Sequence, residues 1–347
     1  MSIRVNAKEF QKMSEELLTS IGAHVDVAVD CAYALTSASL RGIDTHGIAL
    51  LPKILRRVRD NRCRVEESLN GQMHDKTSAV GIIDAKLAPG QHSCMVAARE
   101  AAKRASQFGS GLITVRNSTH FGCCSPFLEV ILRERMVGFV GSNSVRSMAT
   151  FGLKKANLGN NPFGFAAPRN DKRDFVFDFS SAVMSYGKRI DYLEKGKELP
   201  KGSFVTSDDD DKTTSVVYEI ADSLEQVALP FGGFKGASVA VIIEILSGLL
   251  SGGHSGADTE SFDKDGLFLG PSHFVLAIAP QKFGLVKFEE NVQRYIEGIR
   301  RGEDIRLPGD RAEKEMACRR SLGIPIQDPV VNEIESWATE LDVGVTW

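Results

Sequence analysis

The chain has 347 residues, enough for about two domains with a substantial apolar core. Its apolar share of 42%, charged share of 25% and net charge of −3 are typical of a globular protein and give no reason to expect nucleic acid or another polyanion as a partner. We expect a cytoplasmic protein without a membrane span, because no run of eighteen apolar residues and no apolar signal-peptide core occur in it.

Helical periodicity dominates the sequence up to about residue 64. Phe10, Met13 and Leu17 recur at spacings of three and four, and Gly22 is a typical helix end. The segment 51–64 has the same periodicity and carries several arginines. A solvated helix face explains these arginines better than a nucleic-acid contact does, because the net charge is negative and no aromatic residues lie between them for base stacking.

Strand-like segments alternate with helical ones from about Ser78. The expected strands are AVGIID, LITV, VGFVG, FGFAAP, FVFDFS and HFVLAIAP, and the expected helices include SCMVAAREAAKRASQFG and SPFLEVILRERM. This alternation predicts an α/β core. Helix-like patterning returns from Phe288. We therefore expect a helical domain built from both chain ends, residues 1–75 and 285–347, and an α/β cofactor- and substrate-binding domain of residues 76–284.

Two further segments carry distinct patterns. The segment 237–253, ASVAVIIEILSGLLSGG, is apolar around nearly its whole circumference, which predicts a buried or interface helix. The acidic run 207–212 is expected to be a solvated loop rather than a metal site. The cysteines show no CxxC or other metal-binding spacing, which favours reduced thiols and no bound metal; they are Cys31, Cys63, Cys94, Cys123, Cys124 and Cys318.

Two of the seven histidines end polar clusters that follow apolar segments. His46 lies in RGIDTHG and His120 in NSTHFG, and a glycine follows each within two residues. Glycine beside a functional group lets a ligand approach the backbone closely, and α/β proteins place ligands at strand ends. Because histidine changes its protonation near neutral pH, these two side chains are candidates for proton transfer.

Nucleotide-binding fingerprints are mostly absent. No G-x-G-x-x-G follows a strand, and no G-x-x-x-x-G-K-[ST] occurs, so the usual dinucleotide-binding fold and the P-loop are not expected. One glycine-rich turn, GGFKG at residues 232–236, precedes the apolar helix. Free N–H groups at a helix start and a lysine would form an anion site. A tight turn into a buried helix explains these glycines equally well.

Seven segments between Arg41 and Asp310 occur in the order typical of one enzyme family. They are RGIDTHG, VRNSTHFG, NLGNNPFGFAAP, FDFSSAVMSYGK, LPFGGFKG, EILSGLLSGG and RLPGD. On these segments the chain resembles the malate/L-lactate dehydrogenase family of the second type. That family also includes ureidoglycolate, sulfolactate and 2,3-diketogulonate oxidoreductases and a cyclic-imine carboxylate reductase.

The resemblance implies a homodimer that binds NAD, or NADP, in a mixed-sheet fold distinct from the Rossmann fold. It implies that His120 is the acid/base group, which exchanges a proton with the substrate oxygen, and that Thr45 and His46 line the same cavity. Residues matching segments around the cofactor are Asn160, Pro162, Asp178, Ser180, Ser181, Lys188, Gly233, Lys235, Gly236, Arg306 and Gly309. Arg146 and Asn117 are the expected substrate contacts.

The chain departs from this family at the substrate clamp. Leu50 stands where the family has an arginine that binds the substrate carboxylate, and Ile54 where it often has an aromatic residue. Arg146 stands where it tends to have proline or a small residue. The expected activity is hydride transfer between a nicotinamide cofactor and a small 2-hydroxy or 2-oxo acid such as malate or lactate. Two alternatives stay open: a cyclic 2-imino acid reductase, and a cofactor-binding or structural protein that has lost turnover.

Overall fold

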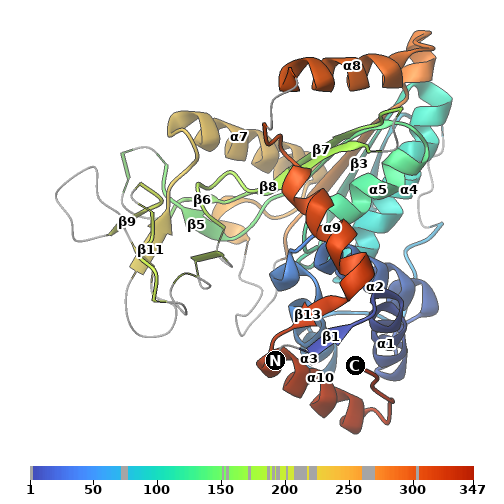
Figure 1. Cartoon of the computed structure of the whole chain (residues 1–347), viewed down its shortest axis with the longest axis vertical. Helices are drawn as coiled ribbons and strands as arrows, with labels where there is room; N and C mark the ends of the chain where they lie inside the picture. The colour runs from blue at the N-terminus through green and yellow to red at the C-terminus, as the bar shows by residue number, and fades with distance from the viewer. Residues whose placement is uncertain are drawn as a thin grey trace. The chain divides into compact units, whose positions relative to one another are not determined.

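A computed structural model of the chain describes most of its residues in two compact units (Figure 1). The described residues are 3–71, 77–150, 152–153, 156–170, 173–185, 188–189, 192, 196–200, 202–206, 217–218, 225–259, 270–301 and 305–347. The acidic run 207–212 lies outside them. Unit 1 contains residues 1–140, 164–178 and 274–347, and unit 2 contains residues 141–163 and 179–273.

A six-stranded sheet forms the centre of unit 1, with the strand order β2-β3-β12-β4-β7-β8. The strands are β2 (Val80–Asp84), β3 (Ser110–Arg116), β12 (His273–Ile278), β4 (Val137–Ser142), β7 (Phe163–Ala167) and β8 (Phe175–Phe179). They match the six strands predicted from the sequence to within two residues at each end. β2 and β3 are parallel, with Asp84 paired to Arg116, so the polar residues that end both strands lie at one edge.

Two predicted helices cover this sheet. They are α4 (Gly90–Phe108) and α5 (Ser125–Arg133). The alanines of α4 are buried in the core together with Ile113 and Val115 of β3. A Cβ atom at Gly111 would overlap the carbonyl of Ala101, so glycine at this position allows the strand to lie directly against the helix. This close packing holds α4 against the start of β3.

The helices predicted at both chain ends are present, and they belong to unit 1 together with the six-stranded sheet. They are α1 (Ala7–Ser20), α2 (Val25–Leu40), α3 (Leu51–Arg59), α8 (Phe288–Arg300), α9 (Asp310–Leu322) and α10 (Asp328–Glu340), with the short helix η5 (Pro280–Phe283). The ends are joined by an antiparallel pair of strands, β1 (Ile3–Val5) and β13 (Ile324–Ile326). The guanidinium of Arg59 lies over the ring of Trp337, which connects α3 to α10. The arginines of α3 thus have intramolecular partners, consistent with a structural role.

The predicted division into residues 1–75 plus 285–347 and residues 76–284 stays a prediction about domains. The compact units have other bounds, because the chain passes from one unit to the other at residues 140–141, 163–164, 178–179 and 273–274. In chain order, these four passages lie within β4, β7, β8 and β12. Continuous apolar strands give no sequence signal for such a boundary.

Unit 2 contains a smaller mixed sheet and one long helical segment. Its strands are β5 (Arg146–Met148), β6 (Leu158–Gly159), β9 (Phe204–Thr206), β10 (Val217–Tyr218) and β11 (Glu225–Ala228). β11 pairs parallel with β5 and antiparallel with β9 and β10. The helix α7 (Phe234–Glu244) continues as a π-helical turn, η3 (Ile245–Leu249), and a short turn η4 (Gly256–Asp258) follows.

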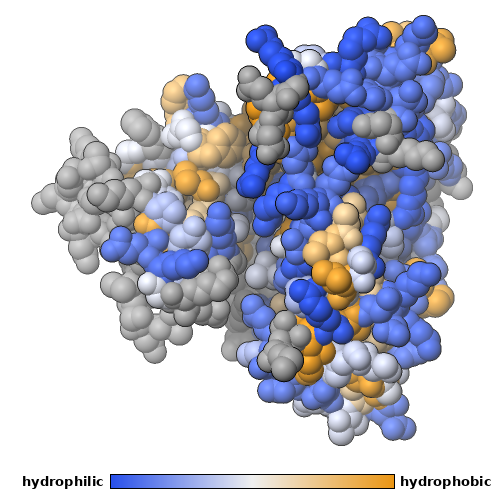
Figure 2. All heavy atoms as spheres, viewed as in Figure 1, coloured by the Kyte–Doolittle hydropathy of each residue, from blue (hydrophilic) through white to orange (hydrophobic). Residues whose placement is uncertain are grey.

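The apolar segment 237–253 is helical but only partly buried. Ala240 and Ile243 are buried, whereas Val241, Ile242, Ile245 and Leu249 are 44–58% exposed. Figure 2 shows apolar side chains at the surface in this part of the molecule. The sequence predicted either a buried helix or an interface helix. Full burial is wrong, and the interface alternative remains. No helix in the described part of the chain is both long and apolar enough to cross a membrane.

Candidate active site

The polar segment after β3 begins with Asn117, which is held against the neighbouring strand. Its amide donates to both carboxylate oxygens of Asp84, at 3.0 and 3.1 Å, and Arg116 donates to the same carboxylate at 3.2 Å. Burial opposes ionisation of Asp84, but these hydrogen bonds outweigh it and lower the pKa of that carboxyl. Asn117 has a positive φ of 52°, which asparagine tolerates well, so the chain turns sharply at this residue.

The next two residues are fixed by the first turn of α4. The hydroxyls of Ser118 and Ser93 lie 2.8 Å apart, and the Gly90 N–H donates to the Thr119 hydroxyl at 3.0 Å. A Cβ atom at Gly90 would overlap the carbonyl of Thr119 and the backbone of Phe121. The start of α4 therefore packs directly against residues 118–121 and leaves them one conformation.

His120 and His46 form a pair at the end of this segment. Their ring centroids lie 5.4 Å apart. The N–H of Gly122 donates to Nδ1 of His120 at 3.3 Å. Since Nδ1 faces this backbone N–H, Nε2 is the ring nitrogen that we assign to proton exchange. Both rings are partly buried, where a small ligand can replace water.

His46 lies on the short helix η1 (Asp44–His46), and η2 (Ile48–Leu50) follows directly. The Thr45 hydroxyl lies 2.9 Å from His46 Nδ1. Burial, and to a smaller extent the positive charge of Lys53, lower the pKa of His46 to about 4, so this ring is neutral at neutral pH. The predicted Thr45–His46 pair therefore does lie next to His120.

Gln91 was missed by the sequence analysis. Its side chain is 1% exposed, and neither Nε2 nor Oε1 has a hydrogen-bond partner among the described residues. A Cβ atom at Gly122 would lie 3.7 Å from Gln91 Nε2 and 3.9 Å from the His46 Cβ. Only the adjacent Gly90 hints at Gln91 in the sequence, and a glutamine at a helix start is too ordinary to single out.

Three of the predicted cofactor residues lie in unit 1. Asp178 accepts a hydrogen bond from the Ser125 N–H at 2.8 Å, at the start of α5, and burial raises the pKa of its carboxyl. A Cβ atom at Gly309 would overlap the carbonyl of Val176. Close packing of residue 309 against β8 therefore requires glycine at this position. Arg306 is exposed.

Most of the other predicted cofactor residues in unit 2 lie around the entrance to α7. The Asn160 carbonyl accepts from the Ser181 N–H at 2.8 Å, and the Ser181 carbonyl accepts from the Phe231 N–H at 3.0 Å. A Cβ atom at Gly236 would lie 3.0 Å from the Ser181 carbonyl. The structure therefore brings Asn160, Ser181 and Gly236 together through backbone contacts. The carbonyl of Pro162 accepts from the Ser142 N–H at 3.1 Å, in the strand leading out of β4.

The turn 232–236 has the geometry of an anion site. Gly232 and Gly233 have positive φ values of 59° and 65°. The N–H groups of Phe234 and Lys235 have no recorded acceptor within the part of the chain that the structure describes. Lys235 is exposed and makes no ion pair with a described residue. Free N–H groups at the start of an eleven-residue helix, together with a lysine, suit a phosphate.

The remaining predicted residues of unit 2 are less constrained. Lys188 is exposed, with its ammonium 5.9 Å from the centre of the Tyr192 ring. Arg146 is exposed on β5 and makes no ion pair with a described residue. Ser180 is partly buried directly after β8.

Comparison with known proteins identifies the family. The malate/(S)-sulfolactate dehydrogenase of Methanothermus fervidus is 26% identical over 345 residues, 99% of each chain. The Δ1-pyrroline-2-carboxylate/Δ1-piperideine-2-carboxylate reductase of Pseudomonas putida is 24% identical and matches 94% of each chain. The crystal structure of malate dehydrogenase from Entamoeba histolytica superposes with a TM-score of 0.90 over 100% of both chains at 21% identity, which shows the fold. The malate/L-lactate dehydrogenase family model matches residues 5–335, so the chain belongs to that family and is an oxidoreductase of the dehydrogenase type.

Proposed function

We propose that the protein transfers hydride between a nicotinamide cofactor and a small 2-hydroxy or 2-oxo acid such as malate or lactate. The observation that carries this proposal is the pair of His46 and His120, in which Nδ1 of His120 faces the Gly122 N–H and Nε2 is the nitrogen assigned to proton exchange. An acid/base group of this kind is what reduction of a carbonyl needs, because the oxygen must gain a proton as C2 gains a hydride.

The residues of unit 1 account for the proton. In reduction, the imidazolium form of His120 donates its Nε2 proton to the C2 oxygen of the substrate and becomes neutral; in oxidation the neutral ring accepts that proton at Nε2 and becomes positively charged. The cofactor, when bound, supplies or accepts the hydride at C2. His46 is neutral at neutral pH, so it does not oppose the positive charge that His120 carries after accepting a proton. Thr45 holds the His46 ring in one orientation through its contact with Nδ1.

The residues of unit 2 suit the anionic part of such a cofactor. The free N–H groups at the start of α7 and Lys235 would hold a phosphate; the positive φ of Gly233 shapes the turn that leads to them, and Gly236 packs against Phe231 of the same turn. We propose that further residues bind the same cofactor: Asn160, Pro162, Asp178, Ser180, Ser181, Lys188, Arg306 and Gly309. The cofactor is NAD in this proposal, with NADP as the alternative.

A homodimer and a cytoplasmic location complete the proposal. The exposed apolar side chains of α7 and η3 would be covered in a dimer, since exposed patches of this kind mark interaction sites (Figure 2). Light scattering after size-exclusion chromatography measures the mass directly. A mass of one chain at micromolar concentration would contradict the dimer.

A spectrophotometric screen tests the activity. It would follow oxidation of NADH and NADPH with a panel of 2-oxo acids and cyclic imines. Reduction of a 2-oxo acid such as oxaloacetate or pyruvate is the expected result. Cofactor binding without turnover of any compound would favour the alternative of a protein that has lost activity.

A cyclic 2-imino acid reductase is the second candidate. Its support is the similarity to the Pseudomonas putida reductase. A ring imine is also protonated and reduced at the carbon next to a carboxylate, so His120 would keep its role. Faster turnover of a cyclic imine than of every 2-oxo acid would replace the first proposal by this one.

A further inference from the structure

The amide of Gln91 is a buried polar group without a protein partner. Its side chain is 1% exposed, and neither of its two polar atoms is hydrogen-bonded to a described residue. A buried amide that loses its water without gaining a partner destabilises the fold, and most buried polar groups are paired. Such a group therefore needs an explanation, and a ligand that completes its hydrogen bonds is one.

Gln91 lies beside the two histidines. Gly122, whose N–H donates to His120, would bring a Cβ atom within 3.7 Å of Gln91 Nε2 and 3.3 Å of the His46 carbonyl. Gly90, the residue before Gln91, already packs on Thr119 and Phe121. The Gln91 amide therefore lies close to Gly122, the same residue that approaches the His46 carbonyl and donates to His120.

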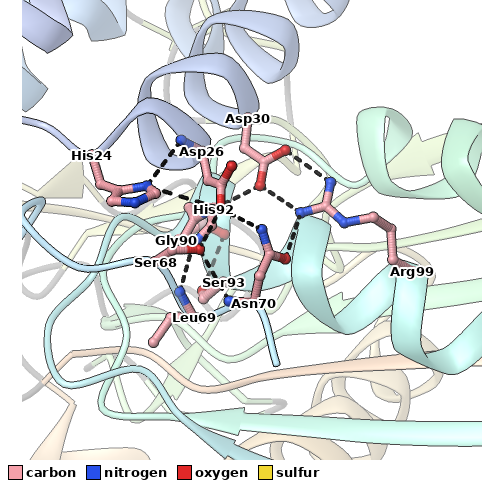
Figure 3. A network of polar contacts seen from close by, with 10 residues as sticks. All are labelled: His24, Asp26, Asp30, Ser68, Leu69, Asn70, Gly90, His92, Ser93 and Arg99. Atoms are coloured by element: carbon pink, nitrogen blue, oxygen red, sulfur yellow. Dashed lines mark hydrogen bonds and ion pairs between the residues drawn. The ribbon is translucent and has the colours of Figure 1, made fainter. Parts of the chain in front are cut away.

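The first turn of α4 is also fixed against rotation. His92, directly after Gln91, is fully buried; its Nδ1 lies 2.7 Å from Asp30 and its Nε2 accepts from the Leu69 N–H at 3.0 Å. Arg99 binds both oxygens of the same carboxylate at 2.7 and 2.8 Å (Figure 3). The ring of His92 is held at both nitrogens, so the helix cannot turn and Gln91 keeps its direction.

We propose that the Gln91 carboxamide binds the carboxylate of the substrate and serves as an uncharged anchor in a site where Leu50 supplies no cation. This inference rests on the proposed function, since it takes an anionic 2-oxo acid as the ligand. The N–H groups of Nε2 donate to a carboxylate oxygen, and the positive end of the α4 dipole stabilises the same charge. An uncharged anchor binds less tightly than arginine and makes Gln91 the residue that determines specificity for the acid group.

Binding of oxalate, a stable carboxylate analogue, tests the subsite without turnover. Calorimetric titration would be done in the presence of saturating NADH, with the wild type, Gln91→Leu and Gln91→Glu. We expect about 10- to 100-fold weaker binding to Gln91→Leu, the usual effect of losing a hydrogen bond to a charged group. Binding to Gln91→Glu should be weaker still, because two negative charges would meet.

Thermal unfolding separates this role from a structural one. Gln91→Leu removes an unpaired buried amide, so its Tm should stay unchanged or rise. Thr36→Val on α2 is the matched control, because the Thr36 hydroxyl is also buried and unpaired among the described residues. That variant should likewise keep its Tm, but its oxalate affinity should equal that of the wild type.

Each result is decisive for one of the two proposals. Equal oxalate affinity of the wild type and Gln91→Leu, or no oxalate binding by the wild type, would overturn the role of Gln91. Weaker NADH binding by Gln91→Leu would also overturn it, because the amide would then contact the cofactor. Oxalate binding that depends on Gln91, in an enzyme that reduces no 2-oxo acid, would keep the subsite and reject the proposed function.

Discussion

The segment 117–120 after β3 and the turn 232–236 before α7 are held in place in different ways. The first is fixed through side chains: Asn117 by Asp84, Ser118 by Ser93 and Thr119 by the start of α4. The second is fixed through its backbone, by positive-φ glycines and N–H groups that bond to nearby carbonyls. Its one charged side chain, Lys235, is exposed.

This difference matches what each segment is proposed to do. Proton transfer requires the donor to lie at hydrogen-bond distance, about 2.6–3.2 Å, from its acceptor, so the side-chain hydrogen bonds that hold the segment around His120 in place are useful. Binding of a phosphate depends on charge and on N–H groups, which tolerate a mobile lysine. Substitutions in the first segment should therefore affect turnover, and substitutions in the second should affect affinity.

His120→Asn should have the largest effect. Removing the acid/base group should lower kcat by about 10²- to 10⁴-fold while the affinity for the cofactor stays nearly unchanged. Single-turnover kinetics measure the chemical step, and fluorescence titration with NADH measures the affinity. Wild-type turnover in this variant, under conditions where chemistry limits the rate, would remove His120 from the mechanism.

Arg146→Ala comes next and tests the cationic alternative to Gln91 as the contact of the substrate carboxylate. Unlike Arg116, which is bound to Asp84, Arg146 makes no ion pair with a described residue and is available for a ligand. Its loss should lower kcat/KM for the best 2-oxo acid, which corresponds to a loss of about 2–5 kcal/mol in transition-state stabilisation. The loss should be much smaller for uncharged analogues. Arg56→Ala, on α3 with Glu333 as its partner, is the control and should change kcat/KM little. An equal loss for charged and uncharged substrates would exclude Arg146 as the carboxylate contact.

His46 should make stability depend on pH. Its pKa is lowered to about 4 in the folded state, whereas the unfolded chain binds the proton near pH 6.5. Between these values the unfolded state holds more protons, so stability falls as the pH drops from 6.5 towards 4, by on the order of 1–3 kcal/mol. Urea unfolding of the wild type and His46→Gln at a series of pH values measures the free energy of unfolding as a function of pH. The variant should lose less stability over that interval; identical pH profiles would mean that His46 titrates normally.

The sequence predicted the strand and the turn around the site better than the buried side chain of Gln91. The strand LITV lies within β3, His120 follows it, and the GGFKG turn does precede a helix, because periodicity and glycine carry these features locally. Gln91 could not be found in this way. Its lack of a partner arises only when the start of α4 meets residues 119–122, about thirty positions later in the chain. For a related reason the sequence left burial and an interface open for α7, because an apolar pattern does not say which neighbour covers it.

Lys235→Ala should have the smallest effect, and its salt dependence is the informative part. The side chain is exposed, so its attraction to a cofactor phosphate is partly screened by water and contributes about 0.5–1 kcal/mol, or about 2- to 5-fold in Kd. That loss should appear at low ionic strength and shrink near 0.5 M salt, where the screening length is only about 4 Å. Lys12→Ala on α1, where Lys12 pairs with Glu16, changes the net charge equally and should leave the affinity unchanged. If calorimetry gives the same NADH affinity for Lys235→Ala and the wild type at low salt, the turn is only a structural entry to α7. A loss that persists at high salt would instead mean that Lys235 is held in place like the residues around His120, and the contrast between the two segments would disappear.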